Sequence, residues 1–136
     1  MLKYLLDTNI VIYVIKRRPI EVLDLFNQQA GRMAMSTITL SELYHGAEKS
    51  AKVSQNLEVI EEFSSLLQVL PYTAKASAHY GSIRNSFEKA GLPIGVNDLH
   101  IAAHARSEGL VMVTNNVSEF ARVPGLMVEN WVSALN

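Results

Sequence analysis

The sequence predicts a single α/β domain built on a parallel sheet with helices on both faces. Short apolar runs alternate along the chain with segments whose apolar residues recur at helical spacing. The apolar runs are continuous rather than alternating, as in strands that are buried on both faces. No repeat or linker interrupts the 136 residues, a length suited to one hydrophobic core.

The first third of the chain predicts two strands and two helices. Residues 3–6 form a short apolar strand, and Asn9 is expected to cap a helix that starts at the next residue. Pro19 suits the first turn of a second helix. After a break at Gly31, residues 33–36 read as the second strand.

The middle of the chain predicts mainly helix. Residues 39–42 match the capping-box pattern, which predicts a helix that continues through the following apolar positions. Helical spacing in 53–67 and again in 76–87 predicts an antiparallel helix pair, with a third strand at 69–70 between them. Gly91 is expected to end the second helix of this pair.

The last third predicts one more helix and two more strands. Asp98 is expected to open the helix and Gly109 to end it. Residues 110–113 form the clearest buried strand, and 126–128 are a candidate last strand. Trp131 is expected to anchor the C-terminal end.

Composition and charge limit the functional classes. A formal net charge of −1 gives no basic face for nucleic acid, so such binding must be local or metal-mediated. The absence of cysteine excludes disulfides and thiolate metal sites and fits a reducing compartment. Neither a signal peptide nor a run of about 20 apolar residues is seen, so we expect a cytoplasmic protein without a membrane segment.

Acidic and amide side chains gather near predicted strand ends. Asp7 follows the first strand, Glu42 lies in the first helical turn after the second, and Asn116 follows the strand at 110–113. In a parallel sheet these ends share one edge, where ligands bind. Asp98 reaches that edge if its helix starts there. Grouped carboxylates require a cation, and oxygen ligands suit Mg²⁺ or Mn²⁺, which promote phosphodiester hydrolysis.

Each of these residues also has a structural explanation. Asp7 could simply cap the following helix, Glu42 fits a capping box without metal, and Asp98 would favour a helix N-terminus through the dipole. His100 and His104 are spaced as zinc ligands, but the surrounding zinc-protease pattern is missing, so we expect one to pack and one to face outward.

Four segments in register resemble one family, the PIN-domain ribonucleases, and specifically the VapC toxins of bacterial toxin–antitoxin pairs. The matching segments are LLDTNIVIY at 5–13, STITLSELYHGAEKS at 36–50, PIGVNDLHIAAHA at 93–105 and VTNNVSEF at 113–120. The resemblance implies a PIN-like fold with five short parallel strands flanked by helices, spanning 1–136. It also implies that Asp7, Glu42 and Asp98 hold Mg²⁺, with Mn²⁺ as the alternative.

This chain differs from the family pattern at one position of the expected site. Many PIN domains have a fourth acid where this chain has Asn116, with Glu119 one helical turn further. Asn116 can still orient a water or a ligand, and we therefore expect one well-held ion. The auxiliary residues expected around the site, besides Glu119, are Thr8, Asn9, Asn97 and Thr114, and Arg84 is a candidate RNA contact.

The resemblance further implies an endonuclease in which a metal-bound water attacks phosphorus in line. It suggests initiator tRNA, cut in the anticodon stem-loop, as the substrate. It implies a cognate VapB antitoxin that fills the active-site groove and carries the contact with operator DNA. A homodimer is expected, with the helix pair at about 53–91 as the dimer surface and one wall of the groove.

Two other functions fit parts of the sequence. A phosphatase of the haloacid dehalogenase type also places Asp after its first strand, but it needs a second Asp where this chain has Asn9. A non-catalytic domain that sequesters RNA or a partner is favoured by the missing acid at 116. Substituting Asp7 with Asn would abolish toxicity of a nuclease and leave toxicity by sequestration unchanged.

Overall fold

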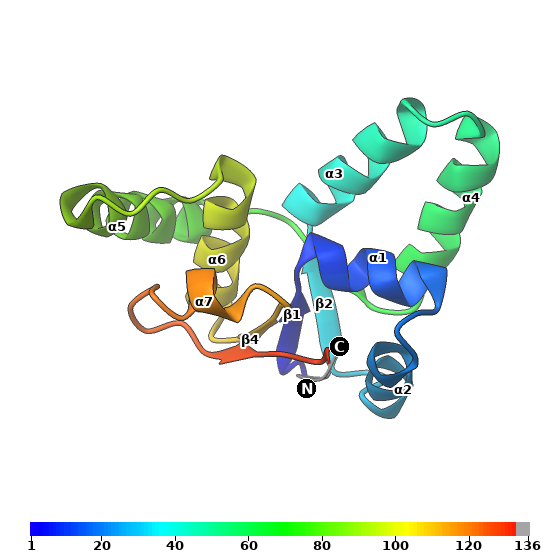
Figure 1. The fold of residues 1–136 in the computed structure, drawn as a ribbon, viewed down its shortest axis with the longest axis horizontal. Helices are drawn as coiled ribbons and strands as arrows, with labels where there is room; N and C mark the ends of the chain where they lie inside the picture. The colour runs from blue at the N-terminus through cyan, green and yellow to red at the C-terminus, as the bar shows by residue number, and fades with distance from the viewer. Residues whose placement is uncertain (133–136) are drawn as a thin grey trace.

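A sheet of five parallel strands, in the order β3-β2-β1-β4-β5, lies at the centre of the computed structural model, which describes residues 1–132 (Figure 1). The predicted parallel α/β fold and its five strands are therefore confirmed. The strands are β1 (Tyr4–Leu6), β2 (Met33–Ser36), β3 (Gln68–Leu70), β4 (Val111–Val113) and β5 (Val128–Glu129). The helices are α1 (Thr8–Lys16), α2 (Ile20–Gln28), α3 (Thr37–Glu48), α4 (Val53–Ser64), α5 (Ala74–Ala90), α6 (Val96–Glu108) and α7 (Val117–Phe120).

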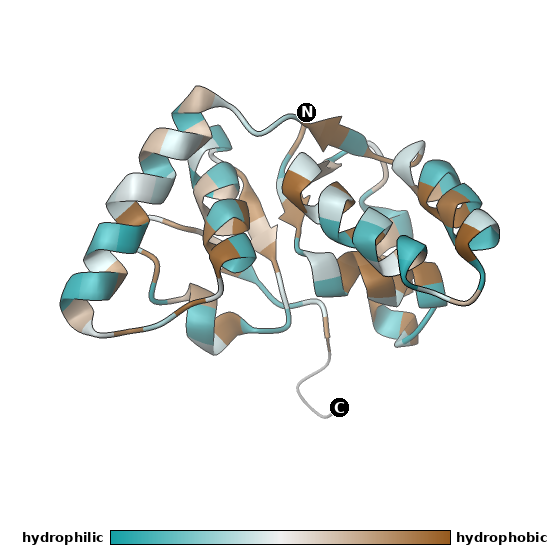
Figure 2. Ribbon diagram, turned by 90° about the horizontal axis from the view of Figure 1, so that it is seen from above, coloured by the Kyte–Doolittle hydropathy of each residue, from teal (hydrophilic) through white to brown (hydrophobic). Residues whose placement is uncertain are grey.

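The sheet divides the core into two hydrophobic clusters. Successive side chains of a strand point to opposite faces, so Tyr4 and Leu6 enter a cluster with α1 to α4, whereas Leu5 enters a cluster with α5, α6 and α7. In Figure 2 hydrophobic residues recur along the strands, while the helices mix hydrophobic and hydrophilic positions. Because both faces are covered, all three residues of β1 are buried, which explains the continuous apolar run.

The predicted antiparallel pairing of the two long middle helices is wrong. α4 packs against α3 and α5 packs against α6, and Figure 1 shows α4 and α5 at opposite ends of the molecule. β3 lies between them in the chain and at the edge of the sheet, so each helix returns to a different face. The dimer surface and groove wall expected at 53–91 stay a prediction.

Two helix starts differ from their predicted positions. Asp7, rather than Asn9, caps α1, because its Oδ1 accepts a hydrogen bond from the Ile10 amide at 3.0 Å. α3 begins directly after β2 and is capped by Ser36, so the capping-box pattern at 39–42 lies inside the helix. In both cases a polar residue at or directly after the end of the strand supplies the cap, and the helix starts at once.

Other chain ends and turns follow the prediction. Gly91 and Gly109 end α5 and α6 in the left-handed conformation. Trp131 is buried and packs edge-on against Tyr4 with ring centroids 5.3 Å apart, so it anchors the end of the described chain as expected. The last strand lies at Val128–Glu129 instead of 126–128. Across residues 1–132, no helix combines the length and apolar character needed to cross a bilayer.

Candidate active site

Asp7 occupies the carboxyl end of the central strand. Its side chain is only 4% exposed, and it accepts hydrogen bonds from the Ile10 and Asn9 amides and from Thr114. Burial raises the pKa of Asp7 above its ordinary value, the three hydrogen bonds oppose this, and the charge of Glu42 adds to the rise. Asp7 is therefore both a helix cap and a buried acid that faces a second acid.

Glu42 is held from a neighbouring element. Its Oε1 accepts a hydrogen bond from the Thr8 hydroxyl at 2.6 Å, and the hydroxyls of Thr8 and Thr39 lie 3.2 Å apart. Thr8 is the first residue of α1, and Thr39 and Glu42 lie three residues apart on α3. This contact joins the two helices that start from β1 and β2 and directs Glu42 toward Asp7.

Asp98 lies in the first turn of α6 and is half-buried. Its pKa is raised to about 6, chiefly by burial and then by the charges of Glu119, Asp7 and Glu42. The N-terminus of α6 therefore does reach the edge where the first two acids lie. Among residues 1–132, no lysine or arginine forms an ion pair with any of these four carboxylates.

Glu119 supplies the fourth carboxylate of the group. The sequence predicted only an auxiliary role for this residue, but its charge acts directly on Asp98. Asn116 donates a 2.7 Å hydrogen bond from Nδ2 to Oε2 of Glu119. The other oxygen, Oε1, is buried and receives no hydrogen bond from a neutral or basic group of the described chain, while the carboxyl of Asp98 lies within hydrogen-bond reach of the Glu119 side chain. The sequence did contain a signal for Glu119. Asn116 and Glu119 are three residues apart at the start of a short helix, a spacing at which the amide side chain can hydrogen-bond to the carboxylate.

The remaining predicted residues divide into two groups. Thr114 is fully buried and accepts a hydrogen bond from the Asn116 amide at 3.0 Å, so it links Asp7 to the turn that carries Glu119. Asn9 and Asn97 are exposed beside Thr8 and Asp98. Apart from the backbone of Asn9, which donates to Asp7, these two residues form no hydrogen bond or ion pair with the acids in the described part of the chain, and their roles stay predictions.

The donor set fits a hard divalent cation. Four carboxylates, from the end of β1 and from α3, α6 and α7, lie together without a compensating base, and the surrounding negative charges contribute to the raised pKa of Asp7 and of Asp98. Within residues 1–132, however, no three acidic or histidine side chains converge as a finished ligand set. Binding of an ion would therefore draw these side chains together.

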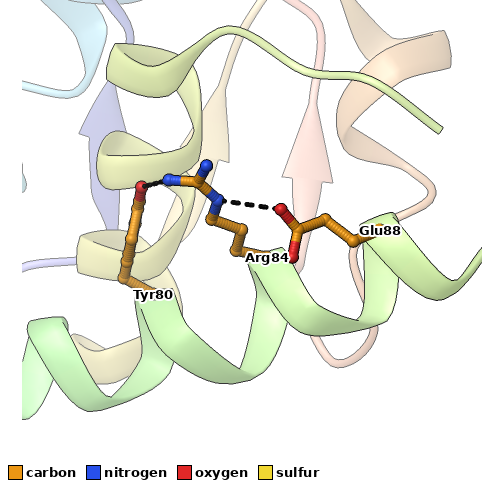
Figure 3. A network of polar contacts seen from close by, with 3 residues as sticks. All are labelled: Tyr80, Arg84 and Glu88. Atoms are coloured by element: carbon orange, nitrogen blue, oxygen red, sulfur yellow. Dashed lines mark hydrogen bonds and ion pairs between the residues drawn. The ribbon is translucent and has the colours of Figure 1, made fainter. Parts of the chain in front are cut away.

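Arg84, the candidate RNA contact, lies on the exposed side of α5 rather than among the acids. Figure 3 shows its guanidinium between Tyr80 and Glu88, one helical turn away on either side. Nη1 donates to the Tyr80 hydroxyl at 2.7 Å, and Nε donates to Glu88 at 3.3 Å. A hollow of about 340 Å³ lies beside Arg84 and is lined by Phe87, Leu92 and Ile94, but none of the four acids lines it.

The two histidines of α6 each lie against a hydroxyl group. His104 is fully buried with Nδ1 2.7 Å from the Ser36 hydroxyl, whereas His100 is partly exposed. His100 stacks on Tyr80 with centroids 4.1 Å apart, and its Nδ1 lies 2.7 Å from the Tyr72 hydroxyl. His104 packs as expected, whereas His100 does not simply face outward, because its ring is partly buried against two tyrosines.

Comparison with known proteins agrees with this fold. A family model described as the PIN domain matches residues 4–126. The chain is 61% identical to ribonuclease VapC2 of Haemophilus influenzae over 97% of its length and all of the relative. It is 51% identical to the tRNA(fMet)-specific endonuclease VapC of Shigella flexneri, covering 96% of this chain and 99% of that one.

A solved structure shows the same arrangement. The chain superposes with a TM-score of 0.93 on the DNA-bound VapBC complex from Salmonella typhimurium, at 48% identity and with 97% of this chain and 100% of that chain covered. The family model matches most of the chain, and the relatives are similar over nearly their whole length, so both comparisons assign the same family. The chain belongs to the PIN-domain family, in the branch formed by the VapC proteins.

Proposed function

We propose that this chain is the toxin of a toxin–antitoxin pair and acts as a metal-dependent endoribonuclease. The observation that carries the proposal is the group of four uncompensated carboxylates, Asp7, Glu42, Asp98 and Glu119, at the carboxyl edge of a parallel sheet. The relatives' names, ribonuclease and endonuclease, support the same activity.

Mg²⁺ is the cofactor we propose, with Mn²⁺ as a substitute. Asp7, Glu42 and Asp98 would hold the ion, and Glu119 would complete the acidic set. When bound, such an ion supplies a positive charge beside the phosphate and makes a coordinated water more acidic. Thr8 and Thr114 hold Glu42 and Asp7 through hydrogen bonds, and would thereby orient both carboxylates for the ion.

Initiator tRNA is the substrate we propose, cut in the anticodon stem-loop. The support is the Shigella relative, which is named for tRNA(fMet) and is 51% identical across nearly the whole chain. The formal net charge of −1 agrees with a folded RNA that is held at a few points, because the chain as a whole has little electrostatic attraction for RNA.

A VapB antitoxin is the partner we propose, and any operator DNA would be bound through it. The related structures are of VapBC complexes, some of them with DNA. A mainly apolar groove of about 460 Å³ runs between α1, α3 and α4, with Glu42 at its acidic end and Lys16 also in its wall. An apolar helix with a basic residue near its end would fill this groove and reach the carboxylates. We also propose a homodimer that acts in the cytoplasm.

Cleavage of purified initiator tRNA tests this function, with elongator methionine tRNA as the matched substrate control. We expect discrete fragments from initiator tRNA with Mg²⁺, none with EDTA, and none from the Asp98→Asn variant. Fragments that persist with EDTA or with Asp98→Asn would contradict a metal-dependent carboxylate site. If the folded protein cleaves no RNA but stays toxic as Asp7→Asn, sequestration would replace the nuclease.

A further inference from the structure

The candidate site is supported by a buried hydrogen bond that lies outside the acidic group. His104 of α6 is 0% exposed, and its Nδ1 lies 2.7 Å from Oγ of Ser36, which is also fully buried. Ser36 is the last residue of β2 and the cap of α3, because its Oγ accepts the Ile38 amide at 3.0 Å. One side-chain contact therefore fixes the start of α3 against the middle of α6.

The hydrogen bonds around Ser36 define the state of the imidazole. The Ser36 oxygen already accepts from Ile38, and its single hydroxyl proton has no acceptor in the described chain except Nδ1 of His104. The hydroxyl therefore donates to Nδ1, and the imidazole is neutral with its proton on Nε2. Burial favours this neutral form, since it lowers the pKa of His104. The Nε2 atom is buried without a hydrogen-bond partner in residues 1–132, and Tyr72 lies edge-on to the ring with centroids 5.5 Å apart.

This bond connects the two helices that carry opposing acids. Glu42 lies on α3 beyond Ser36, and Asp98 lies on α6 before His104, each about 9 Å along its helix axis from the bond at the α-helical rise. The two helices pack against each other. Because helices of this length are stiff, a shift at the bond would move both carboxylates relative to one another.

We infer that His104 is a positioning residue of the proposed nuclease, which keeps Glu42 and Asp98 at the separation needed for the divalent ion. The imidazole itself does not touch the ion or the RNA, since it is enclosed between α6, β2 and Tyr72. The inference depends on the proposed metal-dependent function, and it assigns a role to a buried polar group that the acidic cluster does not use.

Four variants separate this role from simple packing. His104→Leu keeps a side chain of comparable bulk and removes the acceptor, whereas His104→Asn places an amide oxygen near the position of Nδ1. Ser36→Ala removes the donor, and the double variant Ser36→Ala/His104→Leu tests whether the two act as a pair. Ser107→Ala is the matched control, because Ser107 is buried on the same helix but bonds only to the His104 carbonyl, at 2.8 Å.

The readouts are Mn²⁺ affinity by calorimetry, the melting temperature, and kcat and KM for initiator tRNA. We expect His104→Leu to weaken Mn²⁺ binding and to lower kcat, each by roughly tenfold as for other outer-shell changes, with KM little changed. His104→Asn should recover most of both losses, the double variant should resemble the single ones, and Ser107→Ala should match the wild type.

A folded His104→Leu protein with wild-type Mn²⁺ affinity and kcat would overturn the inference. It would also be overturned if His104→Asn and His104→Leu had the same melting temperature and the Asn variant recovered neither Mn²⁺ affinity nor kcat. If His104→Leu does not fold, the comparison of Ser36→Ala with His104→Asn decides by the same criteria. If the wild type cleaves no RNA, the proposed function fails, but the Mn²⁺ affinities still confirm or contradict the positioning role.

Discussion

The hydroxyl of Thr8 donates a 2.6 Å hydrogen bond to Oε1 of Glu42, so that the first residue of α1 holds an acid that belongs to α3. Thr8 directly follows Asp7, the cap of the same helix. The backbone turn that buries one carboxylate therefore also orients the next, and the relative placement of Asp7 and Glu42 depends on a single threonine side chain.

Substitution Thr8→Val is expected to lower cleavage activity roughly tenfold, as is typical when a hydrogen bond to a proposed metal-binding carboxylate is lost. The valine side chain has nearly the same shape, so the free energy of unfolding should change by only about 1 kcal/mol. Thr8→Ser keeps the hydroxyl and should remain close to the wild type. Equal activity of the Val and Ser variants would contradict an orienting role for Thr8.

The raised pKa of Asp98 predicts that metal-free protein loses stability as pH rises. The pKa is about 6 in the folded chain and 3.8 for an ordinary aspartate, so between these values the folded state binds more protons than the unfolded state. The free energy of unfolding therefore falls as pH increases through this window. Asp7, whose pKa is also raised, acts in the same direction.

Urea unfolding at a series of pH values with EDTA would measure this decline. Asp98→Asn should reduce it, and it should be at least as stable as the wild type near neutral pH, because the substitution removes one of several crowded charges. Mg²⁺ should counteract the decline in the wild type. A wild-type stability that rises between pH 3.8 and 6 would show that these carboxylates are not crowded in the folded state.

Asn116→Asp tests the missing fourth acid. The change removes the donor to Glu119 Oε2 and places a further negative charge beside it, so we expect a lower melting temperature in EDTA. The same change adds a carboxylate ligand, so Mg²⁺ should raise the melting temperature more in Asn116→Asp than in the wild type. An equal effect of Mg²⁺ on both proteins would place residue 116 outside the metal environment.

Gly46→Leu tests whether the groove between α1, α3 and α4 receives the antitoxin. Gly46 lines this groove, and a Cβ at this position meets no atom within 4 Å, so a larger apolar side chain can enter the groove without disturbing the fold. We expect Gly46→Leu to escape neutralisation by the cognate antitoxin while it still cleaves RNA, because leucine adds no charge beside Glu42. Gly46→Ala is the control, and unchanged neutralisation of the Leu variant would exclude this groove.

Arg84→Ala tests the predicted RNA contact. The guanidinium is exposed on α5 and bonds only within its own helix, to Tyr80 and Glu88, so its loss should leave the melting temperature nearly unchanged. If Arg84 binds phosphate, KM for RNA should rise severalfold with kcat retained. Lys89→Ala, a neighbouring basic residue of the same helix, is the matched control, and equal KM for both variants would argue against a specific contact.

The sequence was sufficient for the order of the elements because the strands are buried on both faces. Continuous apolar runs at 3–6 and 33–36 correspond closely to β1 and β2, and Gly91 and Gly109 marked real helix ends. Which helix packs on which depended on the strand order. Since β3 lies at the sheet edge, α4 and α5 separate to opposite faces, which no local pattern encodes.

The site was predictable to the extent that strand ends share an edge. Asp7, Glu42 and Asp98 could be assigned to that edge, but their contacts depend on residues from other elements, such as Thr8 against Glu42. Glu119 was underestimated because its approach to Asp98 depends on how the short α7 packs. The Ser36–His104 bond joins residues far apart in the chain and has no sequence signature.

The four carboxylates come from elements that belong to both hydrophobic clusters. Glu42 comes from a helix of one cluster, Asp98 and Glu119 come from helices of the other, and Asp7 stands at the end of the strand between them. An ion shared by these residues would join the halves of the molecule across the sheet. Binding of the ion would then be coupled to local opening of the helices on both faces of the sheet. Amide hydrogen exchange should therefore slow on both faces together when Mg²⁺ is added.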